Sequence, residues 1–442
     1  MITRTLAALA HELEMTAIDD PGVTFSGVST DSRAVEPGNL FVAVVGENFD
    51  GNKFLDDAMA HGAVAVVTSD TAPMDHPRLV VDDTLRTLRD IAAIKRAEMS
   101  IPVVAITGSS GKTSTKDLLA AALPHAWASP RSFNNEIGVP LTVLGTPSDA
   151  EHLVAVVGSR GRGHIAFLMP AVRPDVAVIT NLGVVHLETF GTTDDLADAK
   201  FELVESLTES GIAVLPAGEA RLRRPHAGRT MTFGEENDAD VRISDVSIDD
   251  NGYPRFCITF EGHSAQVQLA VAGIHQASNA AAAMAAGLAL GVDFDSLAAG
   301  LELATGSQWR MEIHRGRFTV VNDAYNANPD SMEAAMRTVA AMPGRHVAVL
   351  GTMAELGPLE VSEHERIGRL ANSLGFAAVI TVGDEPGIAS AAGPIARNVP
   401  DADAAYAAIT QIVDDEDIIL VKASRAIGLE KLALRLAEET QA

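Results

Sequence analysis

A glycine-rich turn that carries a lysine and a threonine gives this chain its clearest chemical signal. In VVAITGSSGKTSTKDLLAAAL the turn lies between an apolar run and a helical pattern. Gly108 and Gly111 let backbone amides face a phosphate, Lys112 can reach the outer phosphates, and Thr113 can offer its hydroxyl to Mg²⁺. The common G-x-x-x-x-G-K-[ST] spacing would need glycine at Ile106, so this is a tighter variant, and a helix start that happens to hold Lys and Thr is the alternative. We predict that ATP is bound by Gly108, Ser109, Ser110, Gly111, Lys112, Thr113 and Ser114.

Such a turn needs a buried strand before it and a helix after it, and the sequence supplies many units of this kind. Apolar runs such as VVAIT, LVAVV and VAVIT alternate with helical patterns, which is typical of parallel strands in βα units. Residues 230–272 interrupt the alternation with VRISDVSI and RFCITF around Asp-Asn-Gly, which predicts an antiparallel hairpin. The alternation resumes near residue 310 with FTVVNDA, HVAVLG, AAVITVG and DIILVKAS.

These patterns predict an α/β protein of three domains, in keeping with a length of 442 residues. Residues 1–82 mix short strands and turns and form a small α/β domain. Residues 83–309 form a central parallel-sheet domain that carries the phosphate loop. Residues 310–442 form a Rossmann-like, doubly wound domain.

Composition excludes several classes of protein. The chain has 33 Lys and Arg against 59 Asp and Glu, a net charge of -26, which repels nucleic acid. Cys257 is the single cysteine, so no internal disulfide can form. No stretch approaches the roughly 18 apolar residues of a membrane span, and the N-terminus is typical of an amphipathic helix rather than a signal peptide. We expect a cytoplasmic monomer with small-molecule substrates.

The segment TGSSGKTSTKD resembles the phosphate loop of the Mur ligase family and of the related folylpolyglutamate synthases. The family's other motifs follow in order: TDSR at 30–33, FNNEIGVPLTVL at 133–144, TNLGVVHLETFG at 180–191, AGIHQASNAAAA at 272–283, NDAYNANPDSM at 322–332, GTMAELG at 351–357 and LVKASR at 420–425. YNANPDSM followed by MAELG resembles the branch that adds D-alanyl-D-alanine. The resemblance implies ATP-dependent, ADP-forming ligation of D-alanyl-D-alanine to a UDP-N-acetylmuramoyl tripeptide through an acyl-phosphate, a cytoplasmic step of peptidoglycan precursor synthesis.

The resemblance also implies a magnesium site beside the phosphates. It makes Thr113 and His186 metal ligands, and it makes Lys200 a carbamylated lysine that presents an anion to the metal. Lys112, His186 and Lys200 are then the catalytic residues. On the residues alone, a lone histidine at a strand end is more often structural, and a lysine in an amphipathic helix pattern usually faces solvent.

Further ATP contacts are implied in two distant segments. Asn279 lies one helical turn beyond His275 and is expected at the adenine. Arg310 is expected at the phosphates, which suit its planar donors, and Asp323 at the ribose. The alternatives are a polar pair near a helix start and exposed salt-bridge partners. Because these residues and the phosphate loop fall in different domains, we expect the domains to close on each other.

Two substrate sites are implied on the remaining motifs, although each would otherwise be an ordinary turn. Contacts to the UDP-linked substrate are expected from Thr30, Asp31, Ser32, Arg33, Asn134 and Asn135. Contacts to D-alanyl-D-alanine are expected from Tyr325, Asn326, Asn328, Lys422, Ser424 and Arg425.

The sequence departs from the family where the metal is concerned. A glutamate that bridges two metals in the family aligns with Val156, and the acid of the L-G-[DE]-M loop aligns with Thr352. A nearby acid such as Glu188 is a candidate replacement. Smaller departures are Asn52, Asn322 and Ala423. They leave open a paralogue that uses another amine, and a nucleotide-binding paralogue that ligates poorly.

Overall fold

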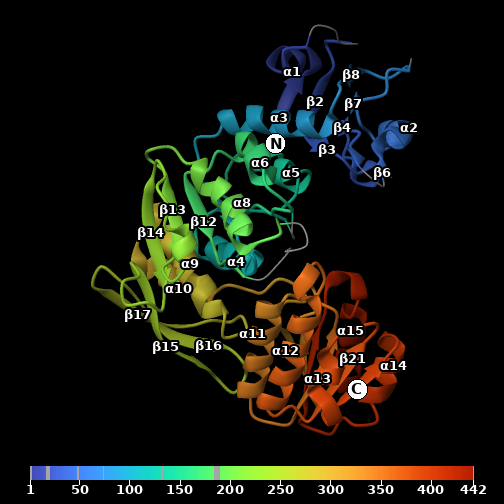
Figure 1. Ribbon diagram of the computed structural model, residues 1–442. Helices are drawn as coiled ribbons and strands as arrows, with labels where there is room; N and C mark the ends of the chain where they lie inside the picture. Colours follow the sequence, from blue (N-terminus) through green and yellow to red (C-terminus); the bar gives the residue numbers. More distant parts are fainter. Residues whose placement is uncertain are drawn as a thin grey trace.

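The computed structural model describes residues 2–15, 20–46, 49–72, 74–130, 133–183 and 190–441. Its strands form main sheets of four, nine and six strands, one in each of three lobes (Figure 1). The lobes follow the chain order: blue, then green to yellow, then orange to red. The predicted three-part α/β fold is confirmed. No helix in the described part of the chain is both long and apolar enough to cross a membrane.

The first lobe contains a small parallel sheet with short helices. Its elements are β1 (Thr3–Thr5), α1 (Leu6–Glu12), β2 (Thr24–Ser26), β3 (Val28–Ser29), η1 (Ser32–Ala34), β4 (Leu40–Val42), β5 (Val45–Gly46), β6 (Phe49–Asp50), η2 (Gly51–Phe54), α2 (Leu55–Ala60), β7 (Ala65–Thr68) and β8 (Arg78–Val80). The parallel sheet has the order β3-β4-β7-β8. One face packs on α2 through Phe41 and Val66. The other face joins a core that continues into the middle lobe.

The middle lobe is a mixed sheet covered on both faces by helices. Its elements are α3 (Thr84–Ala97), β9 (Val103–Thr107), α4 (Lys112–Ala122), β10 (Ala126–Ala128), α5 (Gly138–Leu144), β11 (His152–Val156), α6 (His164–Val172), β12 (Val176–Ile179), α8 (Thr193–Glu205), β13 (Ile212–Pro216), η3 (Ala220–Leu222), β14 (Arg229–Gly234), β15 (Val241–Ile248), β16 (Pro254–Phe260), β17 (His263–Gln268), α9 (Gln276–Ala289) and α10 (Phe294–Glu302). The order is β10-β11-β9-β12-β13-β14-β15-β16-β17.

Strand β9 is central in this sheet, and all five of its residues are buried. Alternate side chains face α4, α9 and α10 on one side and α3, α5, α6 and α8 on the other. This explains why the sequence has a continuous apolar run rather than an alternating one. The predicted hairpin is confirmed for β15 to β17, which pair antiparallel, whereas β14 runs parallel to both of its neighbours.

The last lobe is a doubly wound sheet of order β18-β19-β23-β20-β21-β22. Its elements are β18 (Glu312–Arg315), β19 (Thr319–Asn322), α11 (Pro329–Ala341), β20 (His346–Gly351), η4 (Gly357–Leu359), α12 (Glu360–Ser373), β21 (Ala378–Val382), α13 (Ile388–Ala392), η5 (Gly393–Ile395), β22 (Ala396–Val399), α14 (Ala402–Ile409), β23 (Ile418–Lys422), η6 (Arg425–Ile427) and α15 (Glu430–Gln441). Helices α11, α12 and α13 cover one face, and α14 and α15 cover the other (Figure 1). Strand β18 pairs antiparallel at one edge.

The tip of the β15–β16 hairpin of the middle lobe contacts the last lobe. At the tip of the β15–β16 hairpin, the Asn251 carbonyl accepts a hydrogen bond from Arg315 Nη2 at 3.1 Å, and Tyr253 packs against the core of the last lobe. Nearby, the Ile274 amide donates to Thr338 Oγ1 at 3.1 Å. These contacts place the first residues of the last lobe against the carboxyl edge of the middle sheet.

Candidate active site

The phosphate loop lies between β9 and α4, at the carboxyl edge of the middle sheet. Gly108 has φ +150° and Gly111 has φ +78°. A Cβ at Gly108 would collide with the Thr180 hydroxyl, and one at Gly111 would collide with the Asn279 amide oxygen. Both positions therefore require glycine, for backbone conformation and for close approach. Because α4 begins at Lys112, the amides of its first turn lack partners within the helix and can face an anion.

Cationic side chains from two lobes meet at this loop. Lys112 Nζ donates to the Gly108 carbonyl at 2.6 Å and to the Ser109 carbonyl at 3.4 Å. Arg310, at the start of the last lobe, donates from Nη2 to Thr113 Oγ1 at 3.2 Å. Residues 113 and 310 are thus neighbours in space although 197 positions separate them in the sequence. The structure brings together these predicted ATP residues of the middle and last lobes.

Asn181 is a loop-supporting residue that the sequence reasoning did not single out. Its Oδ1 accepts the amides of Ser109 at 3.1 Å and Ser110 at 2.9 Å, and its Nδ2 donates to Ser110 Oγ at 2.6 Å. The adjacent Thr180 hydroxyl donates to the Ser110 carbonyl at 2.6 Å. The position of Asn181 could have indicated this role, because residues 180 and 181 directly follow β12, which neighbours β9 in the sheet.

The predicted adenine contact, Asn279, is buried against the phosphate loop. Its Nδ2 donates to Gln276 Oε1 at 2.9 Å, and its Oδ1 lies 3.5 Å from Thr115 Oγ1. One turn earlier, burial lowers the pKa of His275 to about 4, which keeps this imidazole neutral near pH 7. Its Nδ1 has no hydrogen-bond partner in the described part of the chain. The adenine role of Asn279 stays a prediction.

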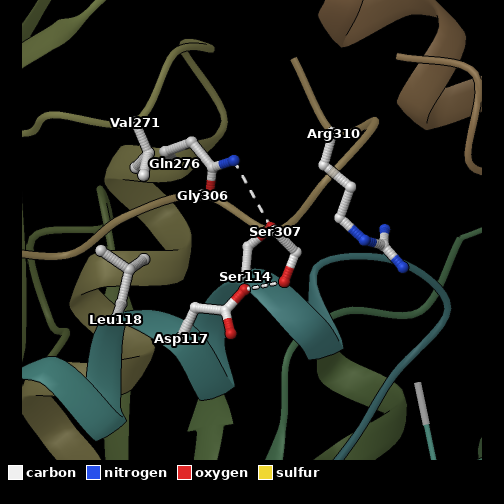
Figure 2. Close-up of a pocket in the computed structure, with 8 residues that line it drawn as sticks. All are labelled: Ser114, Asp117, Leu118, Val271, Gln276, Gly306, Ser307 and Arg310. Atoms are coloured by element: carbon white, nitrogen blue, oxygen red, sulfur yellow. Dashed lines mark hydrogen bonds between the residues drawn. The ribbon is translucent and has the colours of Figure 1, made fainter. Parts of the chain in front are cut away.

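A pocket opens beside the loop, between α4 and the segment that leads to the last lobe (Figure 2). Ser307 Oγ donates to Asp117 Oδ2 at 2.5 Å across it, and Gln276 Nε2 donates to Ser114 Oγ at 3.4 Å. Its lining residues are Ser114, Asp117, Leu118, Val271, Gln276, Gly306, Ser307 and Arg310.

Lys200, on α8, is buried rather than solvent-facing, with 2% of its surface exposed. Desolvation, followed by the nearby charge of Lys112, lowers its pKa well below the usual value. No hydrogen bond or ion pair reaches its amine from residues that the structure describes. Desolvation, followed by the charge of Arg310, also lowers the pKa of Lys112, to about 8. The site thus gathers cations that an anionic ligand would stabilise.

Nucleotide affinity should therefore fall above about pH 8. Bound phosphates would raise the pKa of Lys112, so binding above that pH must take up a proton, and affinity should drop by up to about tenfold per pH unit. Below that pH this group adds no pH dependence. ADP titration calorimetry from about pH 7 to 9.5, in two buffers of different ionisation enthalpy, measures both effects. Lys112→Ala should abolish the proton uptake, and an affinity that stays flat across the range would contradict the assignment.

The described residues alone supply an incomplete set of ligands for a metal at this site. Thr113 supplies a hydroxyl, and the described residues contain no group of three or more His, Cys, Asp or Glu side chains that could hold an ion. Val156, at the end of β11, is apolar and 1% exposed. His186 and Glu188 lie outside the described residues, so their predicted roles have no geometry here. The residues that are described fit a magnesium ion carried by nucleotide phosphates, and Val156 does not fit a bridging ligand.

In the last lobe, the predicted ribose and dipeptide residues form a hydrogen-bonded cluster. Lys422 is buried and pairs with Asp323 Oδ2 at 2.5 Å, and it also donates to the Asn326 carbonyl at 2.9 Å. Asp323 Oδ1 accepts the Met311 amide at 3.1 Å. Asp323 is therefore the buried partner of an ion pair. The alternative to a ribose contact, that Asp323 is an exposed salt-bridge partner, is wrong as to its exposure.

The other predicted dipeptide residues surround this cluster. Asn328 caps α11 by accepting the Ser331 amide at 2.8 Å. Ser424 Oγ accepts the Ala354 amide at 2.8 Å, which ties the loop after β20 to the end of β23. Arg425 lies over the Trp309 ring, 4.5 Å from its centroid, and pairs with Glu430 at 3.2 Å. These side chains hold the loops together, and their contact with a dipeptide stays a prediction.

The residues predicted to bind the UDP-linked substrate divide between two lobes. Asp31 caps η1 and accepts two bonds from Arg33, at 2.9 Å from Nε and 2.8 Å from Nη2. The hydrogen bonds of Arg33 lower the pKa of Asp31. Asn135 Oδ1 accepts the Gly138 amide at 2.8 Å, where α5 begins, and the Asn134 carbonyl accepts the Gly158 amide at 2.7 Å. Helix α5 contacts β3, which directly precedes Thr30, and Ser32 begins η1 shortly after it.

Arg33→Ala should raise the KM for the UDP-linked substrate more than it lowers kcat. Asp31 fixes the guanidinium, whose side chain is 83% exposed, so the remaining donors can face a diphosphate. Loss of a hydrogen bond to a charged group predicts an increase of roughly tenfold. Steady-state kinetics measures it, with Arg369→Ala as a surface control. An unchanged KM would move the uridine diphosphate site elsewhere.

Comparison with known families covers most of the chain. Residues 24–100 match the description "Mur ligase family, catalytic domain". Residues 106–287 match "Mur ligase middle domain", and residues 309–425 match "Mur ligase, glutamate ligase domain". All of these matches carry the same family name.

Individual proteins agree with this assignment. The UDP-N-acetylmuramoyl-tripeptide--D-alanyl-D-alanine ligase of Bacillus subtilis (strain 168) is 33% identical over 457 residues, which cover 99% of each chain. MurF from Acinetobacter baumannii has a TM-score of 0.91 and 29% identity, with 99% of both chains covered. MurF ligase from Thermotoga maritima, solved in complex with ADP, has a TM-score of 0.84 and 30% identity over 94% of this chain and 97% of that one. The chain belongs to the Mur ligase family.

Proposed function

We propose that this chain is the ATP-dependent, ADP-forming ligase that joins D-alanyl-D-alanine to a UDP-N-acetylmuramoyl tripeptide. The observation that carries the proposal is the similarity to the Bacillus subtilis ligase of that name over 99% of both chains. The site supports it, because a phosphate loop in one lobe meets an arginine from another lobe, as a two-substrate ligase with ATP requires.

The chemistry proceeds in two balanced steps. A terminal carboxylate oxygen of the tripeptide attacks the γ-phosphorus of ATP, and ADP leaves. The free amine of the dipeptide then attacks the acyl carbon, phosphate leaves, and the amine loses a proton. Lys112, Arg310 and the first-turn amides of α4 are the groups that can neutralise phosphate charge during the first step. Asn279, which is buried against the phosphate loop, would contact the adenine, and Asp323 the ribose.

Magnesium belongs to this proposal through the phosphates. When bound, the ion would neutralise phosphate charge, and Thr113 would hold it with the nucleotide. Lys200 would serve as a carbamate. The carbamylation needs a neutral amine that attacks CO2 and loses a proton, and the lowered pKa of this buried amine favours that form. A carbamate would also place an anion near the Lys112 ammonium, whose charge helps to lower the pKa of Lys200.

The remaining assignments follow the same proposal. We assign residues 1–82 to the UDP-linked substrate, 83–309 to ATP, and 310–442 to the dipeptide and completion of the ATP site. Acceptor contacts would come from the loops that hold Asn326, Asn328, Ser424 and Arg425, with the Lys422–Asp323 pair beneath them. A cytoplasmic monomer acting in peptidoglycan precursor synthesis fits this chemistry.

A phosphate-release assay tests the function. Purified protein is given ATP, magnesium and UDP-linked tripeptide, with and without D-alanyl-D-alanine, and the ligated product is identified by mass spectrometry. We expect release and product only with the dipeptide. Product with another amine, but not with D-alanyl-D-alanine, would assign a different acceptor. ADP binding without product from any amine would identify a nucleotide-binding relative that does not ligate.

A further inference from the structure

Arg310 is held between an aromatic ring of the last lobe and the phosphate loop of the middle lobe. Its guanidinium lies over the Tyr325 ring, 4.1 Å from the centroid. Its Nη2 donates to Thr113 Oγ1 at 3.2 Å. Figure 2 shows this side chain extending from the connecting segment beside the pocket. The ring that supports the arginine thus lies 15 residues further along the chain, in the YNANP segment that the sequence assigned to the dipeptide.

The backbone on either side of Arg310 is fixed by its own contacts. Trp309 and Met311 both have left-handed conformations, with φ +60° and +51°. Such conformations persist in non-glycine residues only where surrounding contacts maintain them. The Trp309 amide donates to Glu312 at 3.1 Å, and the Trp309 carbonyl accepts the Tyr325 amide at 3.1 Å. The Cα of Arg310 is therefore well placed before its side chain is considered.

The side chain has few other supports. Arg310 forms no ion pair with any residue that the structure describes. The acids nearby already have partners, since Asp323 pairs with Lys422 and Asp117 with Lys116. An arginine has several rotatable bonds, so an unsupported guanidinium would adopt several rotamers and would not stay directed at Thr113. A ring face attracts a guanidinium within about 6 Å of its centroid, and the Tyr325 ring supplies that support.

We propose that Tyr325 is a positioning residue for the nucleotide, which holds the Arg310 guanidinium over the phosphate loop. The inference rests on the proposed function only in taking the nucleotide to be ATP or ADP. It changes the expected role of Tyr325, whose ring would act on the phosphates through Arg310 rather than on the dipeptide. The YNANP segment then contributes to both substrate sites, Asn326 and Asn328 to the acceptor and Tyr325 to ATP.

The test compares two substitutions at Tyr325 with a matched control elsewhere. Tyr325→Leu removes the ring, while Tyr325→Phe keeps it. Tyr406→Leu removes a ring under Arg435, 3.4 Å from the centroid, in the same lobe but far from the loop. ADP affinity is measured by calorimetry. We expect Tyr325→Leu to weaken ADP on the order of tenfold, with Tyr325→Phe and Tyr406→Leu near the parent value.

Two further readouts separate positioning from a general loss of structure. In an Arg310→Ala background, Tyr325→Leu should weaken ADP no further, because the ring acts only through the arginine. In steady-state kinetics, Tyr325→Leu should raise the KM for ATP and leave the KM for the dipeptide unchanged. A raised dipeptide KM with unchanged ADP affinity would overturn the proposal. So would an equal loss in Tyr406→Leu, or an additive loss in the double variant.

The ligase assignment and the role of Tyr325 can be refuted independently of each other. A parent protein that binds ADP but forms no ligated product would refute the ligase assignment. The comparison of Tyr325→Leu with Tyr325→Phe in ADP binding would still decide the role of the ring. A parent protein that does not bind ADP would overturn the inference as well.

Discussion

Lys112→Ala should lower ATP-dependent turnover by on the order of 10²–10³-fold and leave the protein folded. The ammonium is the cation closest to the loop's own carbonyls, 2.6 Å from that of Gly108, and phosphates would replace these carbonyls as its partners. Its removal takes away charge stabilisation where negative charge moves during phosphoryl transfer. Steady-state phosphate release measures the loss.

Stability should not fall in the same variant. Desolvation lowers the pKa of Lys112 to about 8, so the folded protein holds this cation at some cost, and alanine relieves that cost. We expect an unchanged or slightly raised Tm, with matching circular dichroism. Lys431→Ala, an exposed lysine on α15, serves as the control and should change neither property. Retained turnover in a folded Lys112→Ala protein would remove Lys112 from the site.

Val156→Glu should raise turnover by on the order of tenfold or more, with the largest gain at low magnesium. Val156 ends β11 beside Ile106 of β9, just before the phosphate loop, and its amide donates to Ser129 Oγ at 3.0 Å. The Ser129 carbonyl in turn accepts from the buried Lys116 Nζ at 3.2 Å. A carboxylate introduced here has a cation nearby and, when nucleotide is bound, the magnesium carried by its phosphates. It would supply the anion that valine does not.

Val156→Gln is the matched control, because it has nearly the same shape without the charge. Turnover is followed against magnesium concentration for parent, glutamate and glutamine variants, and bound Mn²⁺ is counted in the presence of an ATP analogue. We expect only the glutamate variant to need less magnesium and to bind an additional ion. If the parent already turns over at ordinary rates of about 1–10³ per second at low magnesium, and glutamate adds nothing, valine does not impair the metal site. Glu188→Gln would then test whether that acid has taken the role.

Local sequence determined the parts of this protein that depend on neighbouring residues. The apolar run VVAIT, followed by glycines and a lysine, predicts β9, the phosphate loop and α4, because burial, positive φ and helix initiation are all short-range requirements. The same alternation predicts the three α/β sheets. The order of motifs predicts the family, and within that resemblance the apolar residue at 156 predicts that a bridging metal ligand is absent.

Only the tertiary structure decided which side chains meet. Arg310 reaches Thr113 across 197 residues, Lys422 pairs with Asp323 across 99, and Asn181 binds the amides of Ser109 and Ser110 across about 70. Motif spacing cannot give such pairings, because they depend on how strands from distant segments are ordered in a sheet and how one lobe packs on another. The same holds for the lowered pKa values of Lys112 and Lys200. Desolvation depends on what covers a side chain, and in this fold the covering elements come from distant parts of the chain.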